Sequence, residues 1–270
     1  MKINWFPGHM KKALQEMKKL LANIDALIYV LDCRAPISSI NPSLNKLAEG
    51  KKILFVFNKF DLSDQERVKF LAKSFKKPNS DYVCLDSTMS GSSKIIKQKI
   101  NNLCRDKLEK FKAKGLKTTI RALVVGVPNS GKSTLVNNLC GKAKAITGNK
   151  PGVTKLNQWV AIGDNIELCD TPGTLYPNLE NQEIAKKLCL IGSIKDQIFD
   201  ELELATELLK MLEEKYPSEL ANRFKEAKDL GEIAKNRGYL LGKGELDLSM
   251  AANAVIDDFR KGRIGRITLD

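Results

Sequence analysis

The chain reads Arg121-Ala-Leu-Val-Val-Gly-Val-Pro-Asn-Ser-Gly-Lys-Ser-Thr-Leu-Val-Asn-Asn-Leu139 at the point that decides its fold. An apolar run passes through a glycine-bounded loop into an amphipathic pattern, which predicts a strand, a phosphate loop and a helix. Between Gly126 and Ser133 the spacing is G-x-x-x-x-G-K-S. With this spacing, backbone N–H groups surround the phosphates, Lys132 reaches the terminal ones and the Ser133 hydroxyl binds magnesium. The expected phosphate contacts are Asn129, Ser130, Gly131, Lys132, Ser133 and Thr134.

Such a loop ordinarily opens its domain, whereas about 120 residues precede it here. The chain has 270 residues and is 43% hydrophobic, which suits one large globular domain or two smaller ones. Its apolar runs at 26–31 and 53–57 are far shorter than the ~18 residues of a membrane span. Without an apolar signal region, we expect a cytoplasmic protein with no membrane partner. Six cysteines without a C-x-x-C pair predict reduced thiols and no zinc site.

The net charge of +13 is unevenly distributed. Residues 1–178 carry 30 Lys and Arg against 14 Asp and Glu, a net +16, whereas residues 179–270 carry 15 against 18, a net −3. This asymmetry favours a polyanionic partner for the first part, and nucleic acid fits better than a membrane. Solvated lysine faces in a lysine-rich protein are the alternative that charge alone leaves open.

Two buried-strand patterns precede the phosphate loop. Residues 25–32 end at Cys33-Arg-Ala-Pro36, and residues 53–57 run into Asn58-Lys-Phe-Asp61. N-K-x-D after a strand is typical of guanine recognition, because the Asp61 carboxylate accepts from both N1–H and the 2-amino group, and adenine presents neither donor. We expect Asn58 to brace the loop and bond the base, and the Lys59 stem to cover the ring face. Alone, the pattern is equally an exposed turn; a phosphate loop in the same chain favours the guanine site.

Residues 81–86 predict a third strand, and Ser87-Thr88 follows it. GTPases usually place Ser-Ala here and hold the guanine O6 with backbone N–H groups, so Thr88 is a departure. The apolar spacing then predicts one helix over 92–111, with a charged linker at its end. A basic amphipathic helix is predicted over 11–21, after a Pro-Gly turn.

After the phosphate loop and its helix, residues 141–155 are rich in Gly and Lys and predict a mobile loop. Thr154 lies where a nucleotide-sensing threonine closes over magnesium and the γ-phosphate. Two short alternating segments joined at 163–164 predict a hairpin, whose second strand ends in Asp170-Thr-Pro-Gly173. D-x-x-G at a strand end places Asp170 on the metal, usually through water, and the Gly173 N–H at the γ-phosphate.

Beyond Pro177 the pattern becomes helical and richer in Glu and Leu. Helical periodicity covers residues 180–192, 198–215, 218–229, 231–238 and 246–260. We therefore expect a helical domain over 179–270. The basic stretch 257–266 is interpreted in two ways that stay open here, as a tail that touches phosphates or as a frayed terminus.

Ordinary GTPases run phosphate loop, switch threonine, D-x-x-G, N-K-x-D and then Ser-Ala. This chain carries the same five motifs, but N-K-x-D and Ser-Thr come first. A single circular permutation explains the order, since it requires only that the old termini lie close together. The predicted fold class is α/β: a circularly permuted P-loop GTPase fold over 1–178, with a mostly parallel sheet flanked by helices, followed by an all-helical C-terminal domain.

The sequence resembles the circularly permuted GTPases of the ribosome biogenesis GTPase A type over nearly its whole length. The motifs that carry the resemblance are Trp5-Phe-Pro-Gly-His-Met10, Asp32-Cys-Arg-Ala-Pro36, Asn58-Lys-Phe-Asp61, Gly126-Val-Pro-Asn-Ser-Gly-Lys-Ser133, Pro151-Gly-Val-Thr154, Asp170-Thr-Pro-Gly173 and Asp258-Phe-Arg-Lys-Gly-Arg-Ile-Gly-Arg266. The opening Phe-Pro-Gly-His and the permuted order are more specific than the phosphate loop. The resemblance implies a GTPase that binds the maturing large ribosomal subunit and leaves it after hydrolysis.

The resemblance also bears on catalysis. Many GTPases orient the attacking water with a glutamine after D-x-x-G, but this chain has Thr174 there, where the family usually has a hydrophobic residue. His9 is the only histidine, and the resemblance makes it the residue that orients or activates water. From sequence alone, a lone histidine before a helix is more often a surface or capping residue. Asn129 lies where similar GTPases use asparagine to help bind potassium; the alternative is a small polar loop residue.

Three hypotheses follow. The first is GTP hydrolysis, with Mg²⁺ and with K⁺ at Asn129, coupled to large-subunit assembly through ribosomal RNA. The second is a nucleotide-gated RNA-binding scaffold in which hydrolysis is incidental. The third, an ATP-using enzyme, is disfavoured by Asp61 and would show equal affinities for GDP and ADP. The sequence is silent on oligomeric state, and a monomer is the working expectation.

Overall fold

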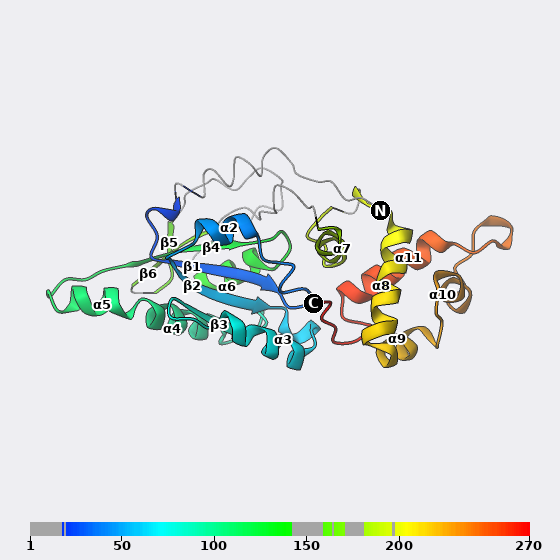
Figure 1. The fold of residues 1–270 in the computed structure, drawn as a ribbon, viewed down its shortest axis with the longest axis horizontal. Helices are drawn as coiled ribbons and strands as arrows, with labels where there is room; N and C mark the ends of the chain where they lie inside the picture. Colours follow the sequence, from blue (N-terminus) through cyan, green and yellow to red (C-terminus); the bar gives the residue numbers. More distant parts are fainter. Residues whose placement is uncertain (1–17, 19, 142–158, 164, 171–180, 196–197) are drawn as a thin grey trace.

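A computed structural model describes residues 18, 20–141, 159–163, 165–170, 181–195 and 198–270 (Figure 1). These residues form an α/β half, built on a sheet, and a helical half that begins at Asn181. The expected domain boundary at 178 and most of the helix expected over 11–21 lie outside the described residues. Within the described part, no helix is long and apolar enough to cross a membrane.

The sheet has six strands in the order β3-β2-β1-β4-β6-β5. The strands are β1 (Ala26–Asp32), β2 (Lys52–Asn58), β3 (Ser80–Cys84), β4 (Ile120–Gly126), β5 (Trp159–Ala161) and β6 (Ile166–Asp170). All neighbours pair in parallel except β5 and β6, which form the predicted hairpin. The apolar runs of β1 and β4 are continuous because helices cover both faces of the sheet, so neither face alternates with polar residues.

Helices cover the sheet on both sides (Figure 1). One face packs against α4 (Ser92–Leu103) and α6 (Lys132–Cys140), with α5 (Arg105–Lys112) at its end. The other face carries α2 (Pro42–Leu47) and α3 (Gln65–Ala72), and the short helices η1 (Phe60–Leu62) and η2 (Lys73–Phe75). The prediction of a single helix over 92–111 is wrong in one respect. The helix is broken into α4 and α5 at Cys104, where φ is −100° and ψ is 19°, although no proline or glycine marks the break.

The helical half contains α7 (Gln182–Leu190), α8 (Glu201–Lys215), α9 (Pro217–Phe224), α10 (Leu230–Arg237), η4 (Gly242–Gly244) and α11 (Leu248–Arg260). The five α-helices match the five predicted segments. Asn or Asp side chains cap the amino ends of α7, α8, α10 and α11, which supplies acceptors to their free N–H groups. Their apolar faces form one cluster, which also takes in Ala35 and Val127 from the α/β half.

The segment after α11 is ordered, so the frayed-terminus interpretation is wrong. Ile264, Ile267 and Leu269 are buried. The Leu269 N–H donates to the Arg34 carbonyl at 2.7 Å, and the Thr268 hydroxyl donates to the Cys33 carbonyl at 3.0 Å. The basic composition concealed this arrangement. The three aliphatic side chains pack into the apolar cluster of the helical half, and Thr268 and Leu269 bond to the loop after β1.

A buried carboxylate cross-links the helical half. Asp258, 1% exposed, accepts two hydrogen bonds of 2.9 Å from Arg223, one of 2.7 Å from Arg237 and one of 3.0 Å from Arg263. Burial alone would raise the Asp258 pKa, but the three guanidinium groups outweigh it and lower the pKa. The carboxylate therefore stays ionised and holds α9, α10 and α11 together.

Replacing Asp258 by asparagine is expected to lower the free energy of unfolding by about 3 kcal/mol at pH 7, because it leaves three arginines around an uncharged group. A lowered pKa in the folded state stabilises the fold above the unfolded-state pKa of Asp, and this contribution is lost as pH falls. Urea unfolding from pH 6 to pH 3 should therefore show the difference from wild type shrinking. Asp257→Asn, a half-exposed neighbour, is the control and should change stability by less than about 0.5 kcal/mol. A loss that is equal at pH 6 and pH 3 would contradict this role for the charge.

Candidate functional site

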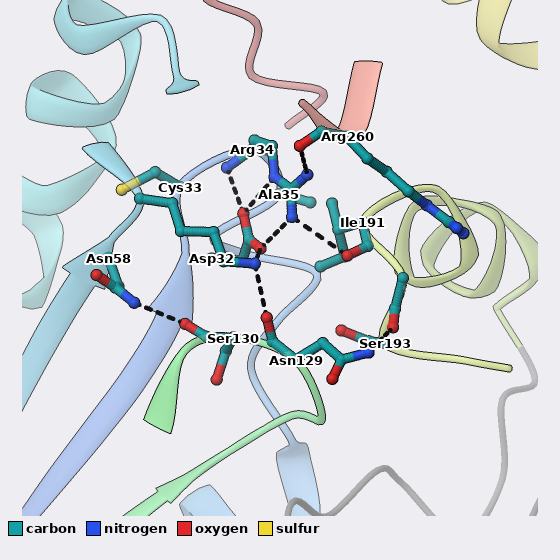
Figure 2. A network of polar contacts seen from close by, with 12 residues as sticks. Asp32, Cys33, Arg34, Ala35, Asn58, Asn129, Ser130, Ile191, Ser193 and Arg260 are labelled. Carbon is teal, nitrogen blue, oxygen red and sulfur yellow. Dashed lines mark hydrogen bonds and ion pairs between the residues drawn. The ribbon is translucent and has the colours of Figure 1, made fainter. Parts of the chain in front are cut away.

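The candidate site lies where β1, β2 and β4 end at the same edge of the sheet (Figure 2). Parallel strands bring their carboxyl ends together, so Asp32, Asn58 and Gly126 meet although they are far apart in sequence. In the last pairs of the register, Asp32 lies opposite Asn58 and Val30 lies opposite Gly126. The loops that follow these three strands build the site.

The loop after β4 is shaped to hold an anion. Gly126, with φ +151°, lies so close to β1 that a Cβ atom would come within 2.3 Å of the Val30 carbonyl oxygen. The Lys132 Nζ donates to the Val127 carbonyl at 2.8 Å, closing the loop onto the start of α6. Ser133 and Thr134 are exposed in the first turn of α6, where free N–H groups and the helix dipole favour negative charge. This geometry suits a phosphate group.

Asn58 braces the loop after β4 against the loop after β3. Its Nδ2 donates to the Ser130 carbonyl at 2.8 Å, and its Oδ1 accepts from the Ser87 N–H at 2.9 Å. Thr88 is held in place by Asp86, which accepts from both its N–H and its hydroxyl. The expected bracing role of Asn58 therefore has a geometric basis, and Ser87 and Thr88 lie in the same assembly.

Lys59 joins the loop after β2 to the loop after β4. It takes a left-handed conformation (φ 59°). Its Nζ donates to the Asn129 carbonyl at 2.6 Å and to the Asp32 carboxylate at 2.8 Å. Asp61 follows in η1 with its side chain exposed, as a carboxylate that accepts from a base must be. The structure thus joins Asn58 and Lys59 to the loop that carries Asn129, and Asp61 follows two residues after Lys59.

Asp32 and Arg34 are part of this assembly, but the motif analysis did not assign them a role. The Asp32 carboxylate is fully buried and accepts from Arg34 Nε at 2.9 Å, Arg34 Nη2 at 2.6 Å and Lys59. Burial opposes ionisation, yet the two cations hold the Asp32 pKa well below its usual range. Burial lowers the Lys59 pKa, and Asp32 works in the opposite direction. The sequence feature that could have indicated this ion pair is a carboxylate at the end of a buried strand, followed two residues later by an arginine.

The helical half reaches this site directly. Asn129 (φ 58°) donates from Nδ2 to the Gly192 carbonyl at 2.6 Å, and Ser193 donates from its hydroxyl to the Pro128 carbonyl at 2.8 Å. The turn after α7 therefore contacts the phosphate loop. The order of the motifs put the start of the helical half within a few residues of Gly173 along the chain, but it did not identify these contacting residues.

A cavity of about 630 Å³ lies between the two halves beside this loop. It is lined by Arg34, Lys59, Asn129, Ile191, Gly192, Ile194, Lys195 and Arg260. Four of these side chains are cationic, so the cavity favours an anionic group. A ligand bound along the phosphate loop would lie beside the contacts between the halves.

Several predicted site residues lie outside the described part of the chain: His9, Thr154, Gly173 and Thr174. The Asp170 backbone ends β6 and pairs with Val124 of β4, two residues before Gly126; its side chain is not described. Ser133, an exposed hydroxyl residue in the first turn of α6, fits a hard cation that takes oxygen ligands. Among the described residues, no cluster of three His, Cys, Asp or Glu forms another metal site.

Comparison with known proteins agrees with the geometry. The family model described as "50S ribosome-binding GTPase" matches residues 121–231. The chain is 37% identical to ribosome biogenesis GTPase A of Bacillus cereus, over 100% of this chain and 94% of that protein. It is 31% identical to the probable ribosome biogenesis GTPase A of Mycoplasma genitalium, over 100% and 97%. A crystal structure of GNP-bound YlqF from T. maritima has the same fold, with a TM-score of 0.68 and 24% identity over 96% of this chain and 97% of that one.

The fold, the phosphate loop and the permuted guanine motif agree with the full-length match to these relatives. Magnesium is the metal that GTPases of this fold generally use. The chain therefore belongs to the ribosome biogenesis GTPase A family and is a GTPase that converts GTP to GDP and phosphate.

Proposed function

We propose that this GTPase is an assembly factor for the large ribosomal subunit, which binds its particle with GTP and leaves after hydrolysis. The main support for the proposal is that Asn58 and Lys59 of the guanine motif donate hydrogen bonds to the phosphate loop, in a chain that belongs to this family. The net +16 of residues 1–178 supports ribosomal RNA as the partner. We place the protein in the cytoplasm as a monomer, with a domain boundary near residue 178.

In this proposal the residues divide by the part of the nucleotide that they bind. The base is read by Asn58, Lys59, Asp61, Ser87 and Thr88. The phosphates contact the loop residues 129–134 and Gly173. Ser133, Thr154 and Asp170 would hold Mg²⁺, which offsets charge on the phosphates when bound.

We further propose that His9 orients the attacking water and that Asn129 helps to bind K⁺. The glutamine that many GTPases use is absent after Gly173, so another side chain must supply this function. For Asn129, the contact from its Nδ2 to Gly192 fixes the amide and leaves its Oδ1 as the atom with which a monovalent cation would interact.

GTP turnover is expected to rise on the order of tenfold when purified large subunits are added, because the particle supplies contacts that complete the site. Multiple-turnover phosphate release over a range of subunit concentrations measures the effect, with small subunits as the control. The same assay with sodium in place of potassium should give a lower rate. Turnover that does not change with large-subunit concentration would count against the assembly role, and equal rates in the two salts would remove the potassium site.

His9→Ala is expected to lower turnover on the order of 100-fold, the low end for a residue that assists proton transfer or water attack, with GTP affinity unchanged. The variant also separates the proposal from its alternative, a nucleotide-gated RNA-binding scaffold in which hydrolysis is incidental. That alternative is supported by the basic charge alone. If hydrolysis times release, His9→Ala should remain on large-subunit particles in sedimentation assays with GTP. Release as fast as wild type would favour the scaffold.

A further inference from the structure

We infer that Asp32 and Arg34 are positioning residues that couple guanine-nucleotide binding to contact between the two halves. Contact between the halves raises the affinity for nucleotide, and bound nucleotide stabilises that contact. The inference rests on the GTPase activity and the guanine site, not on the ribosomal role. It follows from a chain of contacts that runs from Lys59 through Asp32 and Arg34 to the carboxyl ends of two helices in the helical half. Figure 2 shows the part of it from Asp32 through Arg34 to Ile191 and Arg260.

The first step is the ion pair between the Asp32 carboxylate and the Lys59 ammonium. The carboxylate has no exposed surface, and it accepts from the Arg34 N–H at 3.1 Å as well as from Nε, Nη2 and the Lys59 ammonium. A buried carboxylate keeps its charge only while such partners surround it. The Lys59 ammonium therefore has a fixed position, and its stem has a fixed path past the base site.

The second step is the planar fork of Arg34, which is 2% exposed. While Nε and Nη2 hold Asp32, Nη1 donates to the Arg260 carbonyl at 3.0 Å and Nη2 to the Ile191 carbonyl at 3.2 Å. Arg260 is the last residue of α11 and Ile191 follows the last residue of α7. Free carbonyls at helix carboxyl ends attract cations, so one guanidinium satisfies two helix ends and one carboxylate. A lysine ammonium cannot reproduce that planar geometry.

The third step is that separate contacts act on the phosphate loop. Gly192 and Ser193, which follow Ile191, bond to Asn129 and to the Pro128 carbonyl. If the halves separated, Arg34 would lose two acceptors, and Asn129 and Pro128 would each lose a partner. Both the base side and the phosphate side of the nucleotide site would lose support in the same movement.

Linkage makes this coupling reciprocal: whatever docking adds to nucleotide affinity, bound nucleotide adds to docking. The test uses the full chain without ribosomes, so its result is independent of the assembly role. The affinity for a fluorescent GDP analogue and the hydrogen exchange of residues 188–194, with and without GDP, are measured for wild type, Arg34→Lys and Ser193→Ala. Arg237→Lys is the matched control, because it alters an arginine–carboxylate pair inside the helical half, with Asp258.

In wild type, GDP should slow exchange at residues 188–194. Arg34→Lys should weaken GDP binding about tenfold and abolish that protection, and Ser193→Ala should weaken binding about twofold to threefold, within the usual range of coupling between sites. Arg237→Lys should bind GDP as wild type does and keep the protection.

Unchanged GDP affinity together with full protection in Arg34→Lys would overturn the inference. If Arg34→Lys does not fold, Ser193→Ala decides, because it removes one hydroxyl contact and no charge. Wild-type affinity and wild-type protection in Ser193→Ala would then overturn it. An Arg237→Lys variant that loses as much affinity as Arg34→Lys would also overturn it, since the effect would then be general destabilisation.

Discussion

The Gly131→Ala variant is expected to lose affinity for GDP and GTP on the order of 1,000-fold. Gly131 caps α6 with φ +92°, and a Cβ atom there would lie 2.2 Å from the Asn58 Nδ2. Asn58 is buried and bonded on both sides, so it cannot move without releasing Ser130 or Ser87. The phosphate loop must move instead, and each charge-assisted hydrogen bond that it then fails to make to a phosphate costs ~1.5–3 kcal/mol.

Gly91→Ala separates this effect from backbone strain. Gly91 also caps a helix, α4, with φ +89°, but no atom lies within 4 Å of the place that a Cβ atom would take there. The Gly91→Ala variant should lose ~1–2 kcal/mol of stability, because alanine is strained in the left-handed conformation, and should bind nucleotide as wild type does. Calorimetric titration with GDP and thermal unfolding of both variants measure the two quantities. If Gly131→Ala bound GDP as tightly as Gly91→Ala, the close contact with Asn58 would not matter for binding.

The Asp61→Asn variant is expected to lose GDP affinity on the order of 1,000-fold and to gain affinity for xanthosine diphosphate. The carboxylate accepts from N1–H and the 2-amino group of guanine, and an amide replaces two charge-assisted bonds by one acceptor and one misplaced donor. Xanthine carries a carbonyl oxygen in place of the 2-amino group, which the new amide donor can meet. The exposed position of Asp61 in η1 means that the fold does not depend on this side chain.

Displacement of the fluorescent GDP analogue by GDP and by xanthosine diphosphate measures which of the two bases each variant prefers. Asp64→Asn is the matched control: it makes the same change three residues later, where the side chain caps α3, and asparagine caps a helix equally well. That control should keep the preference for GDP. An Asp61→Asn variant that still preferred GDP would show that the base is read elsewhere.

Local patterns predicted much of this structure. The apolar runs of β1, β2 and β4 are continuous because both faces of each strand are buried, and that burial is visible in the sequence. Asn58, Lys59 and the residues after Gly126 could be proposed as site residues because short loops fix their spacing along the chain. The helices of the second half were predicted by periodicity and polar caps, which are also local.

Contacts between distant segments could not be predicted in this way. Arg34 meets Arg260 across 226 residues of sequence, and neither the apolar periodicity nor a motif links them. The sequence of the segment after α11 is basic and has no periodicity, so it gave no indication of a fixed structure. Its Leu269 and Thr268 bond to Arg34 and Cys33 in the loop after β1, which are far away in the sequence. The break at Cys104 carried no signal, since the apolar spacing continues through it.

The strand order has a consequence for synthesis on the ribosome. β1 lies between β2 and β4, but β4 is translated long after β2 and β3. A nascent chain therefore completes its base-reading strands first, and the largely apolar β1 waits with one unpaired edge until residues 120–126 emerge. An open apolar edge is a template for wrong pairing. In the permuted order this edge of β1 therefore stays unpaired until β4 has been made, whereas a GTPase that begins with its phosphate loop makes the strand equivalent to β4 first.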